Sequence, residues 1–123
     1  MPTLSTAFRN AACDAIVDLL DSGDVRFHTS GENEVATCNF GSTAFGAAAT
    51  GTATANSIAD DTDATAGAIE HAHLRDSSQV EQVLCTCGLS GSGADFILTS
   101  LTVGAGDTVS VTSLTVTMPA SPA

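Results

Sequence analysis

The chain has 123 residues, the length of one domain, and its larger apolar side chains suffice for one modest core. Fourteen acidic residues stand against three arginines and no lysine, so the formal net charge is −11. This charge argues against nucleic acid as a partner, because neutralising phosphates requires clustered Lys or Arg. The absence of Trp and Tyr argues against a carbohydrate platform or a base-stacking surface.

Residues 4–22 carry the pattern of an amphipathic helix. Ser5 or Thr3 can cap its start, and Gly23 supplies the left-handed stop. The opposite arc is polar and includes Asn10 and Asp14, which we expect to face solvent. The apolar arc is predicted to pack on one end or one sheet of the β body through four side chains: Phe8, Ile16, Leu19 and Leu20.

After Gly23 the apolar period changes from 3.6 to 2, which is typical of strands. Turn-forming residues separate the strand-like segments. These segments are 25–29, 34–40, 50–58, 66–76, 79–89, 95–103 and 107–118. They predict a mainly β fold, an antiparallel β-sandwich or jelly-roll-like barrel of about seven to eight strands with one N-terminal α-helix. We expect a single domain over 1–123, with the helix at about 4–22, the sandwich at about 24–118 and a short C-terminal tail at 119–123.

The stretch "AFGAAATGTATAN" alternates very small side chains with threonine. Such a strand gains little from burial inside one subunit, because each buried methylene contributes only about 0.8 kcal/mol. Small side chains do allow another chain to approach closely. We therefore predict that this stretch contacts a neighbouring subunit. The predicted contact residues are Ala44, Phe45, Ala47, Thr50, Thr52, Ala53, Thr54, Ala55 and Asn56.

Two pairs at i, i+2 could present metal ligands: His71 with His73, and Cys85 with Cys87 on a neighbouring strand. Imidazole and thiolate together would suit Zn²⁺. However, strand alternation brings any such pair to one face, and CxC lacks the turn-forming spacing of CxxC. We expect no metal or cofactor, with these four residues as the candidates if one is bound.

The four cysteines are predicted to be buried free thiols that pack as small apolar side chains. A disulfide between Cys38 and Cys85 or Cys87 is the alternative, and the redox state of all four, Cys13 included, stays open. No GxSxG elbow or other catalytic signature is present, so no catalytic residue is predicted.

No signal-peptide pattern occurs at the N-terminus, and no apolar run reaches the length of a bilayer span. The sequence thus predicts synthesis in a cytoplasm and no membrane partner.

Four segments taken in order resemble a family of small virion proteins of tailed phages and related viruses. These segments are "AFRNAACDAIVDLLDSGDVRF", "VATCNFGSTAFGAAATGTATANSIADDTDATAG", "HLRDSSQVEQVLCTCGLSGSGADFILTS" and "VGAGDTVSVTSLTVTMP". The stretch at 44–58 is the most specific part of the resemblance. The family pattern differs at "EHAHLR" and at the cysteines, and it offers no catalytic residues to transfer.

The resemblance implies a structural component of a virion. We expect a non-enzymatic capsid cement or decoration protein on the outer surface of the head, made in the host cytoplasm. Its partners would be the major capsid protein and copies of itself. By analogy with other decoration proteins, the expected homo-oligomer is a trimer. One alternative is a tail or connector subunit. An alternative of another class is a small metal-binding, cupin-like β enzyme that uses His71 and His73.

Overall fold

The computed structural model describes residues 2–120. Within them, one helix is followed by nine strands, which confirms the predicted mainly β fold with an N-terminal helix. The elements are α1 (Thr6–Asp18), β1 (Asp24–His28), β2 (Glu34–Asn39), β3 (Thr52–Thr54), β4 (Gly67–Ala68), β5 (His71–Arg75), β6 (Glu81–Gly88), β7 (Phe96–Ile97), β8 (Thr102–Val103) and β9 (Thr115–Thr117). Of the predicted tail 119–123, residues 121–123 lie outside the described part.

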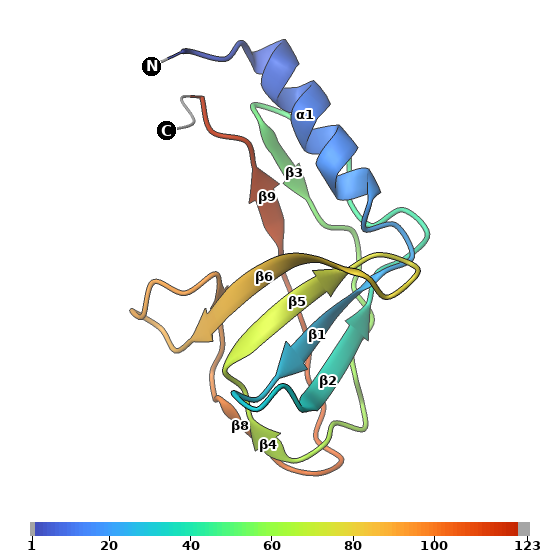
Figure 1. The fold of residues 1–123 in the computed structure, drawn as a ribbon, viewed down its shortest axis with the longest axis vertical. Helices are drawn as coiled ribbons and strands as arrows, with labels where there is room; N and C mark the ends of the chain where they lie inside the picture. The colour runs from blue at the N-terminus through green and yellow to red at the C-terminus, as the bar shows by residue number, and fades with distance from the viewer. Residues whose placement is uncertain (1, 121–123) are drawn as a thin grey trace.

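Five strands form one curled sheet in the order β2-β1-β5-β6-β7, and the first four of these are labelled in Figure 1. β1 pairs antiparallel with both β2 and β5, and β5 pairs antiparallel with β6. β7 instead runs parallel to the end of β6, because the chain turns back through residues 89–95 before β7 begins. The sheet is therefore mostly antiparallel, with one parallel pair that the sequence did not predict.

Two short ribbons lie at opposite ends of this sheet (Figure 1). β3 pairs with β9 beside α1, and β4 pairs with β8 at the far end. The predicted strands 50–58 and 107–118 are regular only over β3 and β9. The predicted strand 66–76 is divided into β4 and β5, and 95–103 into β7 and β8, which accounts for the higher strand number.

The apolar core lies against one face of the five-stranded sheet. Alternation along β1 buries Val25 and Phe27 completely on this inner face. Leu74 of β5 lies opposite Val25, and the ring of Phe96 meets that of Phe27 edge to face at 5.5 Å. The period-2 alternation of Val25 and Phe27 with Arg26 and His28 therefore corresponds to the inner and outer faces of β1.

Helix α1 is shorter than the predicted 4–22. Ser5 is its N-cap, and the Ser5 Oγ accepts a hydrogen bond from the Phe8 N–H at 3.2 Å. The helix ends at Asp18, and Leu19 has the position of the C-cap. Hydrogen-bonded turns then lead the chain into β1.

The predicted packing face of α1 is wrong for three of its four residues. Phe8, Ile16 and Leu19 are 61%, 40% and 55% exposed. Leu20 is buried, together with Cys13 and Val17, which lie on a different arc. The helix therefore packs against the β3–β9 ribbon with its apolar stripe directed outward. We call Phe8, Ile16 and Leu19 the outer stripe.

Polar side chains explain this orientation of α1. The Gly51 N–H donates to Asn10 Oδ1 at 2.8 Å, and the Ala48 N–H donates to Asp14 Oδ1 at 2.7 Å. Arg9 donates to two backbone carbonyl oxygens, one before β3 and one after β9. Backbone groups covered by a helix need such partners. Asn10 and Asp14 therefore face the β body, and the prediction that they face solvent is wrong.

The stretch 44–56 is partly buried within the molecule. Ala44, Phe45 and Ala53 are buried within one copy of the chain, so the predicted subunit contact is wrong for them. A Cβ at Gly51 would come within 2.5 Å of the Arg9 guanidinium, so the lack of a side chain here serves the approach of α1. Thr52 and Ala55 are half-buried, and the exposed remainder of the predicted contact set is Ala47, Thr50, Thr54 and Asn56.

Candidate metal centre

Three histidines gather on the outer face of the five-stranded sheet. The register of β1 and β5 places His28 opposite His71, and His73 shares their face two residues further along β5. The His28 ring is stacked on His71 at 5.5 Å and meets His73 edge to face at 4.6 Å, while His71 and His73 are 4.9 Å apart. All three are only 7–8% exposed, so they form one buried imidazole cluster.

Glu32 extends over this cluster from the turn between β1 and β2. Its Oε1 lies 2.7 Å from His71 Nε2, and its Oε2 lies 3.5 Å from His73 Nε2. The Glu32 backbone has a φ of +65°, a region that usually takes Gly or Asn. The turn therefore holds one carboxylate in an uncommon backbone conformation, facing the Nε2 atoms of two histidines.

Two further carboxylates lie on the other side of these rings. Glu70 Oε1 is 2.5 Å from His71 Nδ1, and Glu81 Oε2 is 2.9 Å from His73 Nδ1. The first contact is a hydrogen bond. The second is close enough for an ion pair, but His73 Nδ1 has no partner in hydrogen-bond geometry. Each ring of β5 is thus placed between Glu32 and an outer carboxylate.

The charge around the cluster is mostly negative. Glu32, Glu70 and Glu81 surround it, and Arg26 lies opposite His73 on this face, whereas Arg75 is paired with Asp24. Burial lowers the pKa of His28, and the nearby His73 and Arg26 add to this effect, whereas the Glu32 backbone opposes it. A neutral His28 has a lone pair available on one ring nitrogen.

The structure does not bring the four candidate ligands, two histidines and two cysteines, together. Across β5 and β6, His71 lies opposite Thr86, whereas Cys85 lies opposite Ala72 on the inner face. Alternation places Cys87 on the same inner side as Cys85, away from the imidazoles. The sheet itself separates the two candidate pairs.

The cysteines of the structure are all free thiols, and the disulfide alternative involving Cys38 is not formed. Burial raises the pKa of Cys38 and Cys85 to about 11 and that of Cys87 to about 12. At neutral pH these thiols stay protonated. They pack in or against the apolar core as small side chains.

Sequence reasoning found His71 and His73 but missed His28 and Glu32. Their separation along the chain gives no spacing motif, and only the pairing of β1 with β5 brings them together. One signal was present, since His28 occupies the polar phase of β1 in the same way as His71 and His73 in β5.

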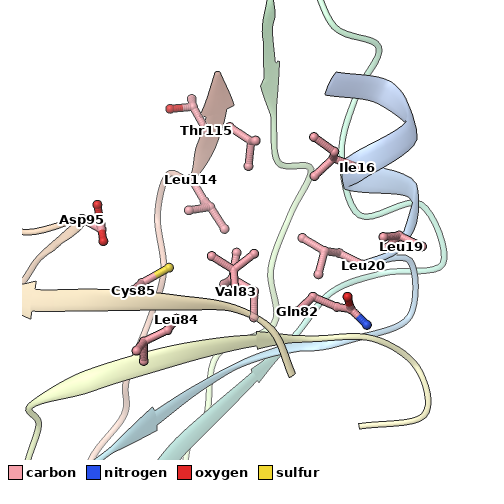
Figure 2. A pocket seen from close by; sticks show the side chains of 12 residues that line it. Ile16, Leu19, Leu20, Gln82, Val83, Leu84, Cys85, Asp95, Leu114 and Thr115 are labelled. Atoms are coloured by element: carbon pink, nitrogen blue, oxygen red, sulfur yellow. The ribbon is translucent and has the colours of Figure 1, made fainter. Parts of the chain in front are cut away.

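A second feature is an apolar groove between the end of α1, β6 and the segment that enters β9 (Figure 2). It encloses about 320 Å³. Ile16 and Leu20 point into it from the helix side, Val83 rises into it from β6, and Leu114 borders it from the β9 side (Figure 2). Leu19 of the outer stripe lies at its rim, so groove and stripe form one apolar surface.

A free strand edge borders this groove. β7 pairs with β6 only at Cys87 and Gly88, so the edge from Glu81 to Cys85 has no strand partner among residues 2–120. The opposite edge of the sheet, β2, is covered: Asp61 accepts from the Thr37 N–H. An unpaired edge beside apolar side chains is a surface on which another chain can add a strand.

No family model, no curated protein and no solved structure matches this chain. The resemblance to small virion proteins therefore stays an expectation from the sequence. In the described part of the chain, no helix combines the length and hydropathy needed to cross a bilayer.

Proposed function

We propose that this protein is a virion structural subunit, a cement or decoration protein that binds the outside of a viral head and holds neighbouring major capsid subunits together. One observation carries the proposal: the outer stripe of α1 continues into the apolar groove beside the free edge of β6. The sequence resemblance supplies the kind of assembly in which this surface would be covered.

The energetics favour coverage of this surface by a partner. Burying a fully exposed Phe, Ile or Leu side chain contributes about 1.5–3 kcal/mol. The residues of the outer stripe are about half exposed, so a partner that covers them would add roughly half of this free energy for each residue. The gain per copy is modest, but the symmetry of a shell repeats it at every equivalent position. Such a role needs binding area and no chemical reaction.

Charge favours a capsid subunit over a second copy as the occupant. Two copies would each bring a net charge of −11. Arg75 is paired with Asp24, and Arg9 is bound to backbone carbonyls, so few cations are available to offset this repulsion. A basic partner surface would be attracted, and salt would weaken that attraction. The trimer stays a prediction. Its formation would require salt to screen the repulsion between the copies, or a capsid lattice to hold them together.

The free edge of β6 gives the partner a specific mode of attachment. A strand of the capsid subunit would extend the five-stranded sheet beyond β6, with main-chain hydrogen bonds along Glu81 to Cys85. Its alternate side chains would enter the groove lined by Val83 and Leu20. This arrangement covers the groove and the unpaired edge together.

Copy counting by mass spectrometry on purified particles tests the proposal. Hundreds of copies that fractionate with heads are expected for a cement protein. Tens of copies that fractionate with tails would replace it with the tail or connector alternative. Absence from mature particles would overturn any virion role.

A matched pair of variants tests the surface itself, using heads stripped of the subunit. Leu19→Asp should abolish rebinding because it places a charge on the rim of the groove. Leu89→Asp is the control, since Leu89 is similarly exposed (47% against 55%) but directly follows the far end of β6. Unchanged rebinding of Leu19→Asp would contradict the proposed contact surface.

A further inference from the structure

We propose that His28, Glu32, His71 and His73 bind one divalent first-row transition-metal ion, with Zn²⁺ as the expected occupant. One ligand atom from each residue lies within 4.8 Å of the other three. This inference does not depend on the proposed virion role, because it rests on the outer face of the sheet and not on the groove.

The first support is the orientation of the ring nitrogens. His71 Nε2 and His73 Nε2 both face the Glu32 carboxylate, at 2.7 and 3.5 Å. Among the described residues, His28 Nδ1 is buried without any partner, and His71 Nε2 is buried with the Glu32 carboxylate at ion-pair distance but outside hydrogen-bond geometry. Buried polar atoms normally have partners, so nitrogens without a hydrogen bond on histidines more than 90% buried indicate a missing ligand.

The second support is the shell of carboxylates behind the rings. Histidines that bind metals usually hold their remote nitrogen against a carboxylate or a carbonyl, which fixes the tautomer and makes the ligand more basic. Glu70 does this for His71, and Glu81 lies close enough to do it for His73. The hydrogen bond between Glu70 and His71 Nδ1 thus leaves His71 Nε2 as the nitrogen that faces the cluster.

The third support is charge. Three carboxylates surround the imidazoles, and Arg26 offsets only one of them. A divalent cation would balance the remaining negative charge. Imidazole with one carboxylate suits Zn²⁺, whereas Ca²⁺ and Mg²⁺ prefer oxygen ligands throughout.

Binding requires a small contraction of the cluster. Ligand atoms at 2.0–2.1 Å from a tetrahedral Zn²⁺ lie about 3.3 Å from one another. The largest separation must therefore fall by roughly 1.5 Å. Glu32 already lies 2.7 and 3.5 Å from His71 Nε2 and His73 Nε2, so the contraction has to bring the ring nitrogens, that of His28 included, closer together. A shallow pocket of about 290 Å³, lined by Glu32, His71 and His73 among others, gives the ion access.

Metal titration of untagged protein, freed of metal with a chelator, tests the proposal. Isothermal titration calorimetry with Zn²⁺ should show one site per chain with a dissociation constant below about 10 µM. Co²⁺ should give the visible d–d bands of a four- or five-coordinate ion. Octahedral Co²⁺ spectra with no saturable Zn²⁺ binding would overturn the proposal.

Variants locate the ion within the fold. Glu32→Gln changes an exposed turn residue and should weaken Zn²⁺ binding about 10- to 100-fold with unchanged circular dichroism. The double variant His71→Ala, His73→Ala should abolish binding. The control is Cys85→Ser, Cys87→Ser on the inner face, which should bind Zn²⁺ as the parent does. Loss of binding in the control, or full binding by Glu32→Gln, would contradict the assigned ligand set.

Discussion

Helix α1 and strand β1 attach to the rest of the molecule in opposite ways. β1 buries Val25 and Phe27 in the core and turns its charged and imidazole side chains to the outer face. α1 fixes its position largely through polar side chains, with Asn10 and Asp14 accepting from backbone N–H groups, while Phe8 and Leu19 stay exposed. Apolar packing of its side chains holds the strand in addition to its backbone pairing with β2 and β5, whereas side-chain hydrogen bonds and a narrow apolar arc hold the helix.

The exposed outer stripe of α1 lowers the stability that the isolated chain could reach. With a modest core, leaving three large apolar side chains in water forfeits stabilisation that the isolated subunit could use. Burying them inside would instead leave the N–H groups of Ala48 and Gly51 without acceptors. The polar contacts decide the orientation, and the stripe stays exposed in the isolated chain.

The largest expected effect is on the β1 side. Phe27→Ala should destabilise the protein by about 3–5 kcal/mol, because Phe27 is fully buried and its ring packs edge to face on Phe96. Urea denaturation followed by circular dichroism measures this. Phe27→Leu is the control and should cost less than about 1.5 kcal/mol. A loss below 1 kcal/mol for Phe27→Ala would show that apolar packing does not hold β1.

A second prediction compares two adjacent leucines at the end of α1. Leu20→Ala should cost about 2–5 kcal/mol, since Leu20 is 2% exposed. Leu19→Ala should cost at most about 1 kcal/mol in the free subunit, since Leu19 is largely exposed. Thermal and urea denaturation of both variants give the comparison. Equal losses would mean that the outer stripe packs within the chain after all.

Period and composition were enough to predict the helix and the β body. They failed where long-range hydrogen bonds decide the outcome. The side-chain oxygens of Asn10 and Asp14 accept hydrogen bonds from backbone N–H groups about 40 residues further along the chain, and nothing in the sequence near these two residues shows this. The predicted packing face of the helix is wrong for that reason. The small side chains of 44–56 indicated a close approach correctly, but the approaching element is α1 of the same chain.

In the candidate metal centre, too, the residues that local sequence indicates differ from those that only the fold brings together. The i, i+2 spacing within β5 was enough to predict that His71 and His73 share a face, because this follows from strand alternation and does not depend on how the strands pair. His28 enters the cluster only through the register of β1 against β5, and Glu32 only through the conformation of its turn. The same register excludes Cys85, which a sequence without strand pairing cannot place on either face.

The smallest of the three effects tests the polar attachment of α1 directly. Asn10→Ala should destabilise the protein by about 1–3 kcal/mol, because the buried Gly51 N–H loses the acceptor that it now holds at 2.8 Å. Asn10→Asp keeps an oxygen at this position and should recover most of the loss. Urea denaturation of the two variants separates the hydrogen bond from the general effect of a substitution at residue 10. Equal stability of Asn10→Ala and the parent would show that water satisfies the Gly51 N–H, and another cause would then be needed for the outward direction of the stripe.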